Sequence, residues 1–232
     1  MNNNEAFKNE QTSTNWENIK DMGCSSVKSE RGNVLCITIV GEIEGHTAAT
    51  QQTKATKYEH LLPLLVSAEE DALIDGLLVV LNTMGGDVEA GLAIAEMISG
   101  MGKPTVSLVL GGGHSIGVPL AVSAKRSYIA STATMTIHPI RMNGQIIGAS
   151  QTFEYLKKVQ NRVVSFVTKN SHVKREGFEK LMHSVGEISN DIGSILEGEE
   201  AVRIGLIDRL GGVRDALDCL YEMIADSKKQ AN

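Results

Sequence analysis

A serine stands between two glycines in the stretch Gly113-His114-Ser115-Ile116-Gly117. An apolar run precedes this stretch and a segment of small residues follows it, which predicts a tight strand-to-helix turn that exposes the serine hydroxyl. A helix that begins there also points free backbone N–H groups at any anion formed beside the serine. Ser115 is therefore a candidate nucleophile. In the alternative interpretation the glycines only permit a turn and Ser115 caps the helix.

A serine hydroxyl is a weak nucleophile and needs a base, so the six histidines of the chain are the next candidates. His138 ends an apolar strand-like segment and precedes Pro139, which favours an extended backbone. A histidine at the end of a strand lies where parallel sheets commonly build their active sites. His138 is therefore the candidate base, with a structural histidine as the alternative. His114 adjoins the serine, but on a tight turn we expect its side chain to point elsewhere.

A second glycine pair, Gly85-Gly86, lies between another strand-like run and another helical segment. Bare N–H groups at that turn are suited to donate to an oxyanion, although simple loop closure or phosphate binding would use the same geometry. A phosphate loop of the Walker type needs Gly-Lys-Ser/Thr, and the chain has no such run. An α/β-hydrolase places an acid between its serine and its histidine, whereas no Asp or Glu lies between Ser115 and His138. That architecture is disfavoured.

Short β-branched and leucine-rich runs alternate with helical patterns in the first 140 residues, which indicates an α/β fold with a largely parallel sheet and right-handed crossovers. The expected strands cover residues 33–43, 74–82, 105–110, 127–131 and 135–139, and the expected helices cover 50–72, 87–102 and 116–125. Helices are also expected over 149–168 and 174–184, from about 198, and over 213–226. The 149–168 helix either projects as an assembly surface or packs in the core.

The length of 232 residues suggests one domain, which we expect over residues 31–226. Residues 1–30 are expected to form a polar, disordered arm without a signal segment, and residues 227–232 a polar tail. No apolar run reaches the roughly 18–20 residues that a membrane-spanning helix needs. The sequence therefore predicts no transmembrane segment.

Charge and cysteine content limit the partners further. A net charge of −6 disfavours nucleic acid as the main partner, because neutralising phosphates needs a basic surface. Cys24, Cys36 and Cys219 match neither a zinc site nor a disulfide framework. We therefore expect no metal and a cytoplasmic setting.

The glycine pair, the serine turn and the histidine strand, in this order, resemble the proteolytic subunits of Clp protease, a serine peptidase family with a crotonase-like α/β fold. The resemblance covers about residues 32–215 and rests on the motifs LNTMGGDVEAG, GGGHSIG, MTIHP and EGEEAVRIGLID. The polar N-terminal extension and the His114-Ser115 pair resemble the translocation-enhancing branch of that family. The resemblance implies repeated β-β-α units, with the 149–168 helix and the preceding residues 141–149 forming a projecting handle.

By this resemblance Ser115 is the nucleophile, His138 is the base, and the Gly86 and Ile116 N–H groups form the oxyanion hole, without a cofactor. The third catalytic residue departs from the family pattern. The position that matches the family aspartate holds Gly193, and the nearest acid, Asp191, lies two residues earlier. We expect a local shift to bring Asp191 to His138, with Asn190 as orienting residue, or a Ser-His dyad, as the alternatives.

The resemblance also implies an oligomeric chamber made of one or two heptameric rings, in which peptides or unfolded polypeptides are cleaved. An ATP-driven unfoldase of the AAA+ class feeds such chambers in the family, but the N-terminal arm could occupy the entrance here, so this partner stays open. The expected function is ATP-independent serine endopeptidase activity that assists preprotein translocation by degrading signal peptides or blocking fragments. Three alternatives remain: a crotonase-type acyl-CoA enzyme, a Ser-Lys peptidase, and a catalytically weak scaffold. For the Ser-Lys peptidase, Lys125 would lie about three helical turns from the serine and out of reach, so another lysine would have to be the base.

Overall fold

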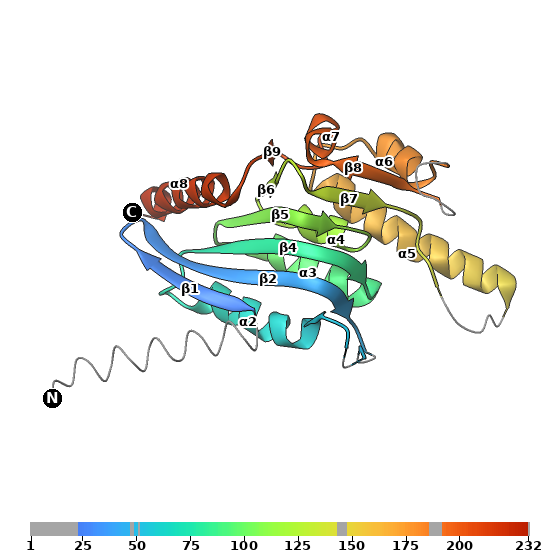
Figure 1. The fold of residues 1–232 in the computed structure, drawn as a ribbon. Coiled ribbons are helices and arrows are strands. Elements are labelled where there is room, and N and C mark those ends of the chain that lie inside the picture. The colour runs from blue at the N-terminus through green and yellow to red at the C-terminus, as the bar shows by residue number, and fades with distance from the viewer. Residues whose placement is uncertain (1–22, 47–48, 51, 143–147, 186–191, 232) are drawn as a thin grey trace.

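The computed structural model describes residues 23–231 except 47–48, 51, 143–147 and 186–191, and Figure 1 shows a twisted sheet with helices packed against it. The strands are β1 (Cys24–Ser29), β2 (Gly32–Glu44), β3 (Ala55–Lys57), β4 (Gly76–Gly86), β5 (Thr105–Gly113), β6 (Arg126–Ile129), β7 (Thr134–Ile137), β8 (Ser194–Glu197) and β9 (Arg209–Leu210). The helices are α2 (Tyr58–Glu70), α3 (Val88–Gly100), α4 (Gly117–Ala121), α5 (Ala149–Lys169), α6 (Arg175–Met182), α7 (Gly198–Arg203) and α8 (Val213–Ala231).

The sheet is mostly parallel, as the sequence predicts. Its main path runs β1-β2-β4-β5-β6-β9, in which only β1 is antiparallel to its neighbour. β7 leaves this path: it pairs in parallel with the end of β5 and antiparallel with β8. Since β4, β5 and β7 run in the same direction, their carboxyl ends meet on one side of the molecule.

Alternating residues of the central strands face two separate cores, because successive side chains of a strand point to opposite faces. Leu77 and Val79 belong to the large core under α2, α3, α4 and α5, whereas Leu78 between them belongs to the smaller core under α8. Ion pairs from Arg31 to Asp218 (2.7 Å) and from Lys228 to Asp75 (2.7 Å) fix α8 at two points along its length. α8 therefore closes the face of the sheet opposite the large core.

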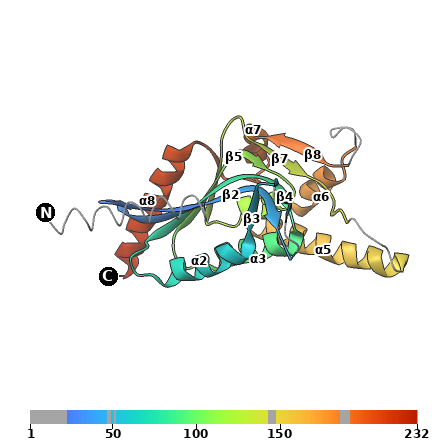
Figure 2. The ribbon, with the colours of Figure 1, turned by 60° about the horizontal axis from the view of Figure 1, so that its bottom comes forward.

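The helix α5 has an exposed half and a packed half. Its buried residues, Val159, Val163, Val164, Phe166 and Val167, all lie in the second half. In the first half Phe153 and Tyr155 are exposed, and Figures 1 and 2 both show this end of α5 extending past the sheet. The expected projecting helix is present, while most of residues 141–149, which were expected to complete the handle, fall outside the described residues.

Several expected boundaries differ from the structure. The helix expected over 50–72 begins only at Tyr58, because residues 55–57 form β3 and pair with the end of β2. The helix expected over 116–125 ends at Ala121, and α8 continues past residue 226 into the segment expected as a tail. Within the expected arm, residues 24–29 form β1 on the edge of the sheet, and residues 1–22 lie outside the described part. The helices of the described residues include none long and apolar enough to cross a membrane.

Candidate active site

A cleft of about 530 Å³ opens where β4, β5 and β7 end, and both catalytic candidates line it. Ser115 follows β5 and His138 follows β7, and both side chains are half-buried. Among the described residues no hydrogen bond joins their side chains. Serine–histidine contacts of unliganded hydrolases are often long and tighten when substrate binds. The two side chains therefore line the same cleft, and we expect the Ser115 hydroxyl and the His138 ring to come into hydrogen-bonding contact when substrate binds.

The backbone of Ser115 has the geometry of an exposed nucleophile. Its φ of +58° lies in the left-handed region, and it is the only described non-glycine residue with a positive φ. A conformation of this kind costs about 1–3 kcal/mol and persists only where neighbouring contacts enforce it. Here the Ser115 N–H donates to Thr136 O (2.8 Å) and the His114 N–H donates to Thr83 O (3.1 Å). These two bonds fix the serine turn between β4 and β7.

The glycine pair at the end of β4 approaches the serine closely. A Cβ placed on Gly85 would lie 2.7 Å from Ser115 Cβ, so only a glycine permits this contact. Thr83, which is fully buried, holds the pair in place: its hydroxyl donates to Gly41 O (2.6 Å) and accepts from the Gly85 N–H (3.0 Å). Because Thr83 O also binds His114, this one residue connects the glycine turn to the serine turn.

Gly86 and Ile116 are the expected oxyanion-hole residues, and the N–H groups next to theirs are hydrogen-bonded elsewhere. On either side of Gly86, the Gly85 N–H donates to Thr83 Oγ1 and the Asp87 N–H donates to Ile43 O (2.9 Å). Gly86 and Ile116 both line the cleft with Ser115. Backbone N–H groups that line a cleft beside a serine are suited to bind an oxyanion.

Ile116 shows the same arrangement on the serine turn. The Ser115 and Gly117 N–H groups before and after it are bonded, to Thr136 O and to His114 O (2.8 Å). Ile116 is the N-cap of α4, so its own N–H lies at the open end of a helix, where backbone donors lack helical partners.

The imidazole of His138 is oriented by the chain itself. Its Nδ1 lies 2.7 Å from Pro139 O. A carbonyl oxygen can only accept, so Nδ1 carries the proton of the neutral ring and Nε2 keeps its lone pair. A histidine in this tautomer can take a proton from a serine hydroxyl through Nε2.

Two residues expected near His138 are not placed by the structure. Asp191 and Asn190 lie outside the described residues. Lys125 is described, and its ammonium donates to Gly102 O and is absent from the cleft lining. No lysine is found among the described residues that line the cleft.

His114, beside the nucleophile, points to β7. Its Nδ1 is hydrogen-bonded to Thr136 Oγ1 (2.9 Å), while Thr136 O accepts from Ser115. Burial lowers the pKa of His114 below its ordinary value, because a charged imidazole is poorly solvated there. His114 therefore acts as a neutral tether between the serine turn and the strand that carries His138.

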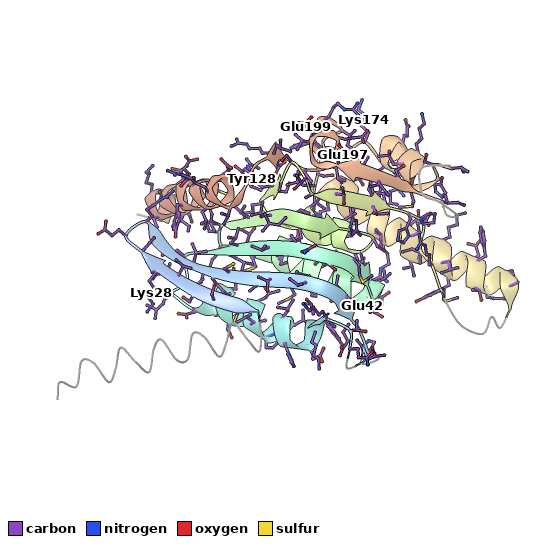
Figure 3. The ribbon with its side chains drawn as sticks, viewed as in Figure 1. Lys28, Glu42, Tyr128, Lys174, Glu197 and Glu199 are labelled. Atoms are coloured by element: carbon purple, nitrogen blue, oxygen red, sulfur yellow. The ribbon has the colours of Figure 1, made fainter. Side chains whose placement is uncertain are left out.

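The remaining lining of the cleft is largely apolar. Its charged members are Glu42, at the end of β2 (Figure 3), and Arg141. The apolar lining residues are Met84, Val88, Ile116, Val118, Ile137, Ile140, Val163, Phe178 and Met182. An extended peptide with apolar side chains fits such a surface.

No group of three metal-ligating side chains occurs within the described part of the chain.

Two important residues escaped the sequence analysis. Thr83 contributes a buried hydroxyl and Thr136 contributes its carbonyl and its hydroxyl, and each connects two segments of the site. Thr83 stands two residues before Gly85, so its place in the motif could have indicated it. The carbonyl of Thr136 carries no sequence signal, because every residue has one.

Comparisons with known proteins agree with this geometry. Residues 31–214 match the family model described as "Clp protease". The translocation-enhancing protein TepA of Halalkalibacterium halodurans is 58% identical over 209 residues, which cover 90% of this chain and 82% of that protein. The ATP-dependent Clp protease proteolytic subunit 1 of Chlamydia muridarum is 25% identical over 138 residues, covering 57% of this chain and 68% of that protein. A putative protease of Methanocaldococcus jannaschii is 25% identical over 214 residues, covering 78% of this chain and 65% of that protein.

Proposed function

Since the chain belongs to the Clp protease family, we propose that it is a serine-type endopeptidase in which Ser115 is the nucleophile and His138 the general base. The observation that supports this most is the strained Ser115 backbone in a cleft that His138, Gly86 and Ile116 also line. A turn with only a structural role would carry the backbone strain of a serine with positive φ without a benefit. A nucleophile gains an exposed hydroxyl.

The proposed reaction is amide hydrolysis in two steps. His138 Nε2 takes the Ser115 hydroxyl proton as Oγ attacks the peptide carbonyl carbon, and the Gly86 and Ile116 amides bind the oxyanion. The imidazolium then gives its proton to the leaving amine, which breaks the C–N bond and leaves an acyl-enzyme. Water, deprotonated by His138, releases the acid and restores Ser115. The assignment of Asp191 as a third catalytic residue stays a prediction.

The proposed substrates are peptides and unfolded polypeptides with apolar segments, taken up in a chamber built from rings of this chain. The apolar cleft lining supports the preference, and the exposed first half of α5, with Phe153 and Tyr155, supplies a surface for assembly. Because the chain has no phosphate loop, hydrolysis itself would not use ATP.

The TepA name suggests a role in preprotein translocation, in which this chain would clear signal peptides or blocked fragments. A signal peptide offers the uncharged apolar run that the cleft lining would accept. None of the three cysteines, all of which are described, forms a disulfide. The proposal accordingly places the activity in the cytoplasm, where thiols stay reduced.

Labelling with a fluorophosphonate tests the proposal. We expect one label per wild-type chain and cleavage of an apolar peptide. Ser115→Ala should lose the label and about 10⁴-fold or more of kcat. Ser131→Ala, which changes an exposed turn serine, is the matched control and should label normally.

Absence of labelling and cleavage at every pH from mildly acidic to alkaline would favour the scaffold. Acyl-CoA turnover that survives Ser115→Ala would favour the crotonase-type enzyme.

A further inference from the structure

We propose that Glu42 selects a cationic residue of the substrate, so that the enzyme preferentially cleaves where a lysine or arginine adjoins an apolar segment. This inference rests on the proposed function, because it concerns which peptides reach Ser115 for cleavage. It assigns a specificity-determining role to a carboxylate that the reaction itself does not use.

Glu42 lies one strand away from the turn that touches the nucleophile. In the parallel register of β2 and β4, Glu42 pairs with Gly85 and Ile43 pairs with Gly86. Neighbouring strands of a sheet lie about 4.8 Å apart. A Cβ placed on Gly85 would in turn lie 2.7 Å from Ser115 Cβ. The long side chain of Glu42 is therefore close enough to meet a substrate residue near the cleaved bond.

The alternation of β2 directs the Glu42 side chain away from the large core. Ile43, the next residue, belongs to that core, and successive side chains of a strand point to opposite faces. Met84, which precedes Gly85 on β4, is 67% exposed, and Glu42 and Met84 both line the cleft. The half-buried Glu42 at the end of β2 (Figure 3) therefore faces the cleft.

The Glu42 carboxylate makes neither an ion pair nor a hydrogen bond within the described part of the chain. Two lysines of the neighbouring segment are placed otherwise. Lys57 pairs with Glu44 (3.9 Å), and Lys54 meets Glu42 through its carbonyl, which accepts from the Glu42 N–H (2.9 Å). Because most of the surrounding lining is apolar, water solvates the carboxylate incompletely, and an ammonium or guanidinium group of the substrate is favoured beside it.

The negative charge is confined to one side of the catalytic pair. Glu42 is the one acidic residue of the described cleft lining, and it stands on β2, beyond the glycine turn. Arg141 also lines the cleft, but it follows β7 on the side of His138. Because the strands run in the order β2-β4-β5 and β7 pairs with β5, the two charges lie on opposite sides of Ser115. A substrate cation is therefore favoured on the glycine-turn side.

This polarity suits an extended peptide with a junction between a basic and an apolar segment. The apolar side chains would contact the apolar lining while the cation pairs with Glu42. A signal peptide contains such a junction, because a positively charged region precedes its apolar run. The inference thus narrows the proposed substrate class to peptides that are cleaved next to such a junction.

The first test uses the full-length wild type and an apolar peptide in which Lys, Gln or Glu occupies one position at a time. At one position we expect kcat/KM to be at least about fivefold higher with Lys than with Gln, and lowest with Glu. Added salt should reduce this preference, because it screens the pair. Equal kcat/KM values for the three side chains at every position, or a Lys preference that salt leaves unchanged, would overturn the inference.

The second test changes the carboxylate. Glu42→Gln keeps the shape of the side chain and should abolish the Lys preference, while cleavage of the Gln peptide stays nearly unchanged. Glu42→Lys should reverse the preference in favour of Glu. Glu59→Gln makes the same charge change at an exposed residue outside the cleft lining, and it should behave as wild type. A Glu42→Gln enzyme that still prefers Lys would assign the selection to another group and overturn the inference.

Fluorophosphonate labelling separates the two proposals. Wild type and Glu42→Gln should label equally, because the probe reacts with Ser115 and carries no cation. If the variant failed to label, the salt dependence of the wild type would decide. A wild type that fails to label refutes the proposed function, whereas a wild type that labels and cleaves without a charge preference refutes this inference alone.

Discussion

The two halves of the cleft are built differently. On the oxyanion side, the glycine turn and the serine turn are held by hydrogen bonds that converge on Thr83 and Thr136 or close the β4 end at Ile43. On the base side, His138 is bonded through its ring to the carbonyl of the next residue. The turns that carry the proposed oxyanion amides are thus held by bonds between segments distant in sequence, whereas the ring of His138 is held by a neighbouring residue.

The comparison predicts its largest effect at Gly86. A Cβ there would lie 2.3 Å from Ile43 O and 2.6 Å from Ile43 N, so Gly86→Ala must displace the turn and its N–H. Loss of one oxyanion donor lowers kcat by about 10²–10³-fold in serine hydrolases, and we expect a loss of this size in a peptide cleavage assay.

Gly100→Ala is the matched control for this prediction. Gly100 has no atom within 4 Å of an added Cβ, so the substitution should leave kcat unchanged. If Gly86→Ala kept more than a tenth of the wild-type kcat, the Gly86 N–H would not be a rigidly held oxyanion donor.

A smaller loss is expected at Thr83. Thr83→Val keeps the shape but leaves the buried Gly85 N–H without its acceptor, which costs about 1–3 kcal/mol. We expect kcat to fall about tenfold with KM nearly unchanged, because the turn that carries Gly86 loosens while the cleft lining stays.

Thr83→Ser restores the hydroxyl and should recover most of kcat, which separates the hydrogen bonds of Thr83 from its packing. A Thr83→Val enzyme with wild-type kcat in steady-state assays would contradict this role.

The smallest effect concerns His114, which joins the two halves. Burial holds its folded-state pKa below the ordinary value of 6.5, so as pH falls through 6.5 the unfolded chain takes up the proton first. The native state therefore loses stability on acidification from about pH 6.5 downward, and this contribution is regained as pH rises.

Both His114→Ala and His114→Asn should flatten the dependence of the thermal midpoint on pH between 5 and 7.5, measured by scanning calorimetry. Equal slopes in the variants and the wild type would mean that His114 does not contribute to acid sensitivity.

The order of elements and the chemistry of the turns could be predicted from sequence because each depends on local pattern. Glycine pairs after apolar runs predicted both turns, and alternating strand and helix patterns predicted the parallel sheet that joins them. β3 escaped, because residues 55–57 pair with β2 only through contacts distant in sequence. The carbonyl partner of His138 escaped for a different reason: main-chain groups are the same at every position, so only coordinates reveal which one a side chain meets.

The cover that α8 provides has a practical consequence. Residues 216, 220, 221 and 224 seal an apolar surface formed by Val34, Leu78, Val106, Leu108 and Tyr128, the last beside α8 in Figure 3. The family match ends at residue 214, and a recombinant version shortened there would retain every described residue of the cleft lining. It would, however, expose that apolar surface to water. Such a version should aggregate during purification, and a helix remote from the chemistry thereby decides whether the protein stays in solution.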